Sequence, residues 1–183
     1  MMKKMLFPAL LMMAILSAAC QKDQAAAGDN YGNGPRTNVP ASLQGSWMYG
    51  NFSMTEYWSQ NPADYLGNAV QFAIAFKFMA DGRYEQYFTS STVTGGIASY
   101  QQSVTRGTVE INSSSHTIVT HANAAHYKRS RNGHTEEERD LEKNELTTTS
   151  SYSFTEGTEA GGTRAIYLKL NNSGNALPFL QKF

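Results

Sequence analysis

The sequence is poor in cysteine, and its single cysteine, Cys20, lies near the amino terminus. A chain with one cysteine cannot form an intrachain disulfide, so its core rather than cross-links must stabilise the fold. An excess of positive charge is also missing, because 15 Lys and Arg residues balance 15 Asp and Glu residues. Without an excess of positive charge the chain has no general attraction for the phosphates of nucleic acids, and we expect no nucleic-acid partner.

Long hydrophobic runs are absent except at the amino terminus. Two lysines there precede an apolar run, Met5 to Leu16, and small residues follow it. This order is typical of a secretory signal peptide, and the run is too short to span a membrane comfortably. We therefore assign residues 1–19 to a signal peptide. Its cleavage would remove two basic residues and no acidic one, leaving a net charge of about −2.

The segment LSAAC, which ends at Cys20, resembles the lipobox of bacterial lipoproteins, with Ser17 where leucine is more usual. The resemblance implies cleavage before Cys20, acylation of its sulfur by chains such as palmitate, and anchoring in a membrane. The alternative is an ordinary signal peptide that leaves a free cysteine. The next residues, QKD, resemble the export signal of Bacteroidetes-type lipoproteins. This implies the outer membrane, with the protein on its periplasmic or cell-surface face.

Downstream of the cysteine the chain divides into two parts. Residues 20–42 are rich in Ala, Gly, Asn and Asp, which favours a flexible tether. Residues 43–183 suffice for one domain and are too few for two. The sequence has no repeat at solenoid spacing, so we expect a single folded unit, and a monomer.

The clearest strand signal lies between Val70 and Thr89, where large apolar residues alternate with small or polar ones in VQFAIAFKF. A three-residue loop, 80–82, with Gly82 in the left-handed conformation keeps the large residues of both arms on one face. A two-residue loop would place them on opposite faces. The predicted inward pairs are Phe78 with Tyr84, Phe76 with Gln86 and Ile74 with Phe88, and Lys77 faces Glu85 on the outside.

Further strand signals follow at intervals of roughly 10–15 residues. The predicted strands cover 45–54, 98–111, 117–131, 146–154 and 164–170, and the last residues, ALPFLQKF, form a closing segment. Apolar residues change phase within 98–111, which predicts a bulge near Gly107. Asn132-Gly133 predicts a two-residue turn that pairs Arg131 with His134, Arg129 with Glu136 and Lys128 with Glu137. Short strands, short turns and no convincing helix predict an all-β, antiparallel up-and-down barrel of about eight strands.

Several short motifs carry a family resemblance. The run Leu43 to Trp47 resembles the Gly-X-Trp opening of lipocalins. The run F-x-F-x-x-D-G-x-Y, residues 76–84, and Gly107-Thr108-Val109 resemble the lipocalin-like domains of Bacteroidetes lipoproteins. The resemblance implies a lipocalin-like barrel whose closed end is plugged by Trp47. The Thr-Asp-Tyr motif of classical lipocalins is absent, so no ligand residues are carried over.

Catalytic and metal-binding motifs are missing from the sequence. It has no Gly-X-Ser-X-Gly elbow and no phosphate-binding loop, and its acidic run, 136–140, lies beside Lys and Arg. On a strand, His116 and His121 point to opposite faces, and so do His121 and His126. We therefore predict that the protein is not an enzyme and that it has no metal site and no cofactor.

Two kinds of function fit this sequence. In the first, the barrel binds a small apolar or amphipathic ligand in its interior. Tyr57, Trp58 and Tyr65, in the connection that follows the first strand, would then form a lid over the mouth. The alternative is a loop whose aromatic rings only cover the edge of the core. In the second, the interior is filled and the surface acts as a protein-interaction or inhibitor module, with the charged hairpin 128–140 as a docking segment. The interior residues predicted to line the ligand site are Phe72, Phe76, Tyr84, Gln86 and Phe88.

Overall fold

The computed structural model describes residues 30–59, 72–171 and 173–182. Over these residues the fold is all-β, with nine strands and one short 3-10 helix, η1 (Lys143–Glu145). No helix in these ranges is long and apolar enough to cross a membrane. The predicted signal peptide, Cys20 and Tyr65 lie outside the described residues.

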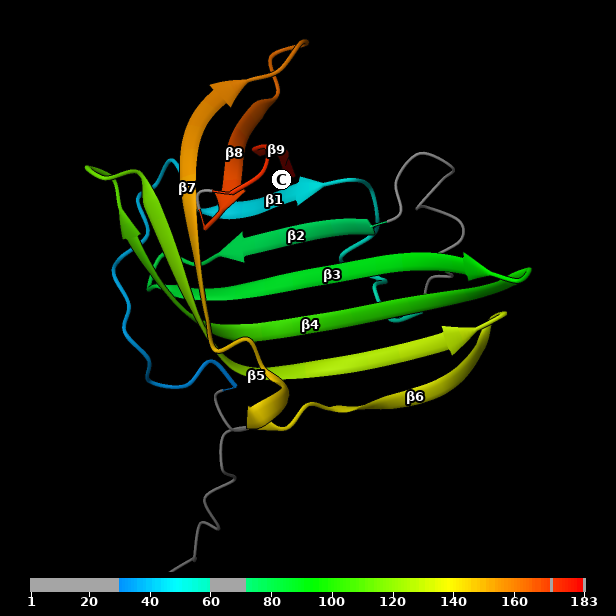
Figure 1. The fold of residues 1–183 in the computed structure, drawn as a ribbon. Helices are drawn as coiled ribbons and strands as arrows, with labels where there is room; N and C mark the ends of the chain where they lie inside the picture. Colours follow the sequence, from blue (N-terminus) through cyan, green and yellow to red (C-terminus); the bar gives the residue numbers. More distant parts are fainter. Residues whose placement is uncertain (1–29, 60–71, 172, 183) are drawn as a thin grey trace, which may run out of the picture.

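The nine strands form one antiparallel sheet that closes in a ring. They are β1 (Gly45–Tyr49), β2 (Phe72–Phe78), β3 (Arg83–Thr94), β4 (Ile97–Asn112), β5 (Thr117–Arg131), β6 (His134–Asp140), β7 (Thr149–Thr158), β8 (Arg164–Leu170) and β9 (Leu177–Lys182). The ring runs β4, β3, β2, β1, β9, β8, β7 and β5, and β5 pairs back to β4. Strand β9 pairs with β1, so the predicted closing segment does close the sheet. In Figure 1, β2 to β6 form one curved layer, and β7 and β8 rise from it.

Strand β5 has three partners, and this arrangement creates an opening in the wall. It pairs with β4 along one edge. Along the other edge, residues 117–121 pair with β7 and residues 126–131 pair with β6. The chain between β6 and β7, residues 141–148, leaves the sheet and contains η1. Residues 122–125 of β5 therefore face this loop instead of a strand.

The hairpin of β2 and β3 has the predicted register. Phe78 pairs with Tyr84, Phe76 with Gln86, Ile74 with Phe88 and Lys77 with Glu85. Gly82 has a φ of +80°, and the N–H of Met79 donates to the carbonyl of Arg83 at 2.9 Å. The three-residue loop and the left-handed glycine are confirmed, whereas residues 70–71 lie outside the described part of the chain.

A bulge lies at Gly107, as predicted, but the extra residue is Asn123 of β5. Strand β4 itself alternates regularly, so its apolar residues before and after Gly107 lie on opposite faces. The prediction that a bulge within this strand corrects their phase is therefore wrong. Val104 is buried on the outer face beside Tyr57, whereas Val109 is buried inside the ring. Both faces of β4 are covered, and apolar residues therefore occur on both.

The outer face of β2 to β4 is covered by the chain that follows β1. Phe52 and Tyr57 pack there against Ala73, Ala75 and Val104. The Tyr57 hydroxyl donates to the Phe88 carbonyl, and the N–H of Ser103 donates to the Tyr57 hydroxyl at 3.1 Å. The alternation in β2 separates large inward residues from small outward ones. Ala73, Ala75 and Phe76 are buried, whereas Phe72 and Ile74 are half-buried.

Residues 30–42 differ from the predicted tether, because they lie against the sheet. Val39 and Leu43 are only 3% and 1% exposed. The N–H of Thr37 donates to the carbonyl of Val109 at 3.1 Å. Their composition suggested flexibility, but two apolar side chains and the backbone bonds are enough to hold this segment in place.

Two other predicted turns differ in detail. The Asn132-Gly133 turn pairs Arg131 with His134, but a bulge follows, so Arg129 pairs with Glu137 and not with Glu136. The ion pairs still form, since Arg129 lies 3.3 Å from Glu136 and 3.4 Å from Glu137. Between the predicted hairpin, which ends at Thr89, and the predicted strand 98–111, the structure continues β3 to Thr94 and begins β4 at Ile97, with a tight turn at Gly95-Gly96.

One end of the ring is solidly filled. Trp47 is fully buried there, and its indole N–H donates to the carbonyl of Leu43 at 2.8 Å. The Arg164 guanidinium lies 5.6 Å from the centre of the Trp47 ring. The core around it draws on β1, β2, β4, β5, β7, β8 and β9 and includes Phe76, Phe78, Val109, Ile118, Phe154, Ile166, Leu168 and Phe179. The cavities inside the ring lie beyond this core, and Phe76, Leu168 and Phe179 at its margin border one of them.

Candidate functional site

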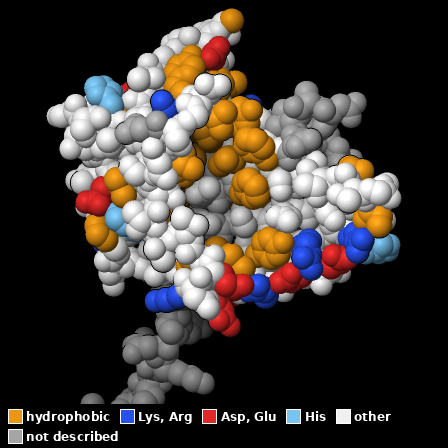
Figure 2. All heavy atoms as spheres, in the orientation of Figure 1, with side chains coloured by type: hydrophobic (Ala, Val, Ile, Leu, Met, Phe, Trp, Pro, Cys, Tyr) orange, Lys and Arg blue, Asp and Glu red, His pale blue; other side chains and the backbone are white. Residues whose placement is uncertain are grey.

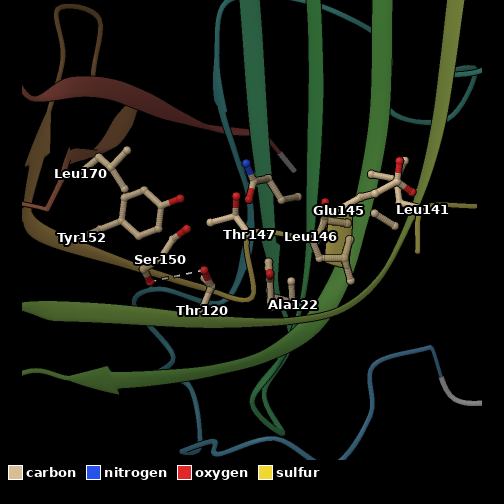
Figure 3. Close-up of a pocket in the computed structure, with 13 residues that line it drawn as sticks. Thr120, Ala122, Leu141, Glu145, Leu146, Thr147, Ser150, Tyr152 and Leu170 are labelled. Carbon is tan, nitrogen blue, oxygen red and sulfur yellow. Dashed lines mark hydrogen bonds between the residues drawn. The ribbon is translucent and has the colours of Figure 1, made fainter. Parts of the chain in front are cut away.

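The first cavity lies inside the ring beside the opening between β6 and β7, with a volume of about 360 Å³. Its walls come from β3, β4, β5, β7, the end of β8 and the loop 141–148. Figure 3 shows Thr120, Ala122 and Ser150 on one wall and Leu146 and Thr147 on the loop that borders it. The lining residues are Tyr84, Gln86, Thr105, Thr120, Ala122, Ala125, Leu141, Glu145, Leu146, Thr147, Ser150, Tyr152 and Leu170.

Hydroxyl groups dominate the chemistry of this first cavity. The Thr120 hydroxyl donates to the Ser150 carbonyl at 3.5 Å, which is the dashed contact in Figure 3. Figure 3 also shows the Tyr152 hydroxyl and Thr147 turned toward one another. Burial raises the pKa of the Tyr84 phenol and of the Tyr152 phenol. Both phenols therefore stay neutral at physiological pH and act as hydrogen-bonding groups.

A second cavity of about 280 Å³ adjoins the first, and Gln86, Tyr152 and Leu170 line both. Its walls are mainly apolar, because they come from the inward faces of β2, β8 and β9. They comprise Ile74, Phe76, Phe88, Leu168, Leu177 and Phe179, with Ser173 and Asn175 at the margin. In Figure 2, apolar side chains gather in the hollow between β7–β8 and the long strands.

A shallower hollow continues from the second cavity along the inward face of β2 and β3. It has a volume of about 330 Å³ and is lined by Phe72, Ile74, Phe88 and residues 90–92. Ile74 and Phe88 also line the second cavity, so the three spaces follow one another. Together they form a groove that is polar at the β6–β7 opening and apolar beyond Gln86.

Among the described residues that line the first cavity, one is charged, and this residue, Glu145, is already paired. Arg139 donates to its two carboxylate oxygens from Nη1 and Nη2, each at 2.7 Å, and the N–H of Glu142 donates at 2.8 Å. The hydrogen bonds from Arg139 and then from Glu142 lower the pKa of Glu145 to about 2. The carboxylate thus remains ionised and is neutralised by one guanidinium.

Five residues predicted to line a ligand site do border this groove. Tyr84 lines the first cavity, Gln86 lines the first two, and Phe76 lines the second. Phe88 and Phe72 border its apolar end. The alternation of β2 and β3 was sufficient to place them, because register decides which side chains face inward.

The predicted lid is wrong for Tyr57 and Trp58. Both lie on the outer face of the sheet, where Tyr57 packs against Tyr87 and Trp58 lies against the ring of His126. Tyr57 is 2% exposed, because it covers the small residues of β2. Neither ring covers the groove, so Trp58 fluorescence is not expected to report a ligand inside it.

Sequence reasoning missed the contributions of β5, β7 and the loop 141–148. The alternation of Thr120 and Ala122 on β5 indicates an inward face, but the bulge at Asn123 moves the inward position to Ala125. Leu141 and Leu146 lie in a segment without periodicity, and no local signal places them at a cavity. Their position follows from the pairing of β5 with two different strands.

A second cluster of polar residues lies on the outer face, around the buried carboxylate of Glu85. The hydroxyls of Tyr31 and Tyr87 each donate a hydrogen bond to this carboxylate at 2.8 Å, and Arg106 donates one from Nε at 3.0 Å. Glu85 is 7% exposed. Burial by itself would raise the pKa of Glu85, but the hydrogen bonds from Tyr87, Tyr31 and Arg106 outweigh it and lower that pKa. Lys77, which pairs with Glu85 across the two strands, is exposed.

Acidification should weaken this cluster. Because the pKa of Glu85 is lower in the folded chain than in the unfolded chain, its contribution is complete above the unfolded pKa and is lost as pH falls through the folded pKa. We expect Glu85→Gln to lower the free energy of unfolding by about 2 kcal/mol at pH 7. The difference from wild type should shrink toward pH 3 in urea melts.

The matched control for this change is Glu159→Gln. Glu159 accepts a hydrogen bond from the Tyr167 hydroxyl at 2.7 Å and is more exposed than Glu85. We expect it to cost less than about 1 kcal/mol. Equal losses for the two variants, or a Glu85→Gln loss that is independent of pH, would contradict the role given to Glu85.

Two of the four histidines, His121 and His126, pair with carboxylates on the outer face. His121 lies 2.8 Å from Glu110, and His126 lies 2.8 Å from Asp140 and 3.6 Å from Glu138. Within the ranges that the structure describes, no group of three His, Cys, Asp or Glu side chains could hold a metal ion.

The groove is therefore the candidate site, and its lining can bind a small molecule through hydroxyls, one amide and apolar surface. In the comparisons with known proteins, no family model, no curated protein and no solved structure matches this chain.

Proposed function

We propose that this protein binds a small amphipathic molecule inside a lipocalin-like barrel, on a domain anchored at the bacterial outer membrane through Cys20. The observation that supports ligand binding is the groove, which is polar beside the β6–β7 opening and apolar beyond Gln86. Its first two cavities, of about 360 and 280 Å³, have together a size in the range of small-molecule sites, roughly 300–1,000 Å³. The filled core at the other end supports a fixed cavity, because close-packed interiors resist rearrangement.

A blocking variant tests this proposal. Ala122 lines the first cavity, so Ala122→Phe should fill part of it, whereas Ala124, which pairs with Arg106, faces outward on the same strand. We expect the wild-type protein to bind the neutral fluorophore N-phenyl-1-naphthylamine and Ala122→Phe to bind it at least about tenfold more weakly. The matched Ala124→Phe variant should bind like wild type.

Thermal melts of both variants show whether they fold, and native mass spectrometry of the wild type counts bound molecules. The ligand proposal fails if the wild type binds neither the fluorophore nor any apolar compound of a lipid panel. It also fails if Ala122→Phe folds and binds as tightly as wild type. The surface-interaction alternative would then take its place, and the β5–β6 hairpin would be the first segment to replace.

The anchor is tested separately. The lone cysteine after small residues supports lipidation of Cys20. We expect Cys20→Ala to move the protein from the membrane fraction to the soluble fraction, because the acyl chains that hold it there are lost. Mass spectrometry of the wild-type amino-terminal peptide should show the added acyl mass. A wild-type peptide without acyl mass, together with unchanged fractionation of Cys20→Ala, would overturn the anchor.

A further inference from the structure

Positive charge is absent from the walls of the groove. Among the described residues, no Lys, Arg or His lines the first cavity, the second cavity or the hollow beyond them. The guanidinium of Arg139 contacts one lining residue, Glu145, and donates two hydrogen bonds to its carboxylate. It also contacts Glu137 at 2.8 Å. The described part of the chain therefore leaves no cation in the groove to receive an anionic group of a ligand.

Apart from the carboxylate of Glu145, which Arg139 neutralises, the polar side chains of the described residues that line the groove are uncharged. Thr105, Thr120 and Ser150 provide hydroxyls from three strands, and Gln86 provides an amide between the polar and apolar cavities. Hydroxyls and amides can both donate and accept, so they match the hydroxyl groups of a polyol, a sugar or a glycerol ester. They cannot compensate the desolvation of a carboxylate or phosphate as a paired cation would.

We propose that this groove selects amphiphiles with an uncharged, hydroxyl-bearing head group over those with an anionic head, and over those with a cationic head because Arg139 already neutralises Glu145. The head lies in the first cavity beside the β6–β7 opening, and the apolar chain passes Gln86 into the second cavity toward Phe88. This selection rests on the proposed ligand-binding function and deepens it. An anionic head at the same place loses its hydration and meets the carboxylate of Glu145 with no spare cation nearby.

Amphiphiles with the same twelve-carbon chain test the selection. They are 1-lauroylglycerol with a neutral head, laurate with an anionic head and dodecyltrimethylammonium with a cationic head. The protein is the full mature chain with Cys20→Ser, so that no acyl chain of its own competes for the cavity. Each compound displaces N-phenyl-1-naphthylamine at pH 8 and below its micelle concentration. We expect 1-lauroylglycerol to bind at least about tenfold more tightly than laurate and than the cationic compound.

A charge placed in the groove should reverse the preference. Gln86→Lys is expected to raise the affinity for laurate relative to 1-lauroylglycerol by at least about tenfold, because the ammonium group pairs with the carboxylate. Ser114→Lys, in the exposed turn between β4 and β5, adds the same net charge away from the groove and should leave the wild-type preference unchanged. The wild-type comparison stands without either variant, should Gln86→Lys fail to fold.

The outcomes separate the two proposals. Equal or tighter binding of laurate than of 1-lauroylglycerol by the wild type overturns the head-group selection while leaving ligand binding intact. Tightest binding of the cationic compound also overturns it, and would indicate that Arg139 leaves Glu145 available. Failure of all three compounds and of the fluorophore to bind overturns the proposed function itself.

Discussion

Replacing Phe76 with alanine should lower the free energy of unfolding by about 3–5 kcal/mol. Phe76 is 1% exposed, and its ring lies 5.5 Å from the rings of Phe78, Tyr152 and Phe179. Removing it takes apolar contacts from three strands and enlarges the second cavity, which Phe76 borders. The measurement is urea denaturation at pH 7, followed by circular dichroism.

The control for this change is the next residue in the chain. Lys77 points outward and is exposed, so Lys77→Ala should cost less than about 1 kcal/mol. Phe76→Leu should fall between the two, because it keeps part of the buried volume. Similar losses for Phe76→Ala and Lys77→Ala would show that the assigned inward face of β2 is incorrect.

Gly107→Ala should also destabilise the fold, by about 3 kcal/mol or more. A methyl group on Gly107 would overlap the carbonyl oxygen of His121 and come within 2.9 Å of the Tyr84 ring. The obstruction is backbone at the bulge of β5, which cannot move aside as a flexible side chain could. Since Tyr84 lines the first cavity, the variant should also weaken binding of the fluorophore.

Gly95→Ala separates crowding from backbone conformation. Gly95 lies in an open turn with a φ of +59° and has no atom within 4 Å of an added Cβ. Its replacement should therefore cost only the strain of the left-handed conformation, about 1–2 kcal/mol. If Gly107→Ala were no more harmful than Gly95→Ala in urea melts, β4 and β5 would not be as close at the bulge as described.

Much of the fold could be predicted from local patterns. The alternation of β2 and the Gly82 loop determine a register in which one face carries Phe76 and Gln86, because a slip of one residue would reverse every side chain. The Asn132-Gly133 turn and the regular spacing of strands likewise predict an antiparallel all-β chain. These signals are local, since each depends on residues that are neighbours in sequence or across one turn.

The rest depends on contacts between segments far apart in sequence. The set of β5 residues that faces inward shifts by one position at Asn123, because Asn123 is an extra residue opposite Arg106 and Gly107 of β4. Tyr57 lies on the outer face rather than over the groove, because the small residues of β2 leave space there that only an aromatic ring from another segment fills. The outward position of Ala73 and Ala75 does not by itself say which segment covers them.

By itself, the sequence determined the strand periodicity, the inward set on β2 and β3, and the amino-terminal pattern that supports an anchor at Cys20. Only the tertiary structure decided where the hollow lies. Strand β5 shares one edge between β6 and β7, so the chain between them leaves the sheet and opens the wall beside Thr120 and Ser150. The same pairing sets Arg139 against Glu145, and the described residues that line the groove include no Lys, Arg or His. A strand's periodicity specifies which way its side chains point, whereas a cavity is specified only when all the strands around it are in place.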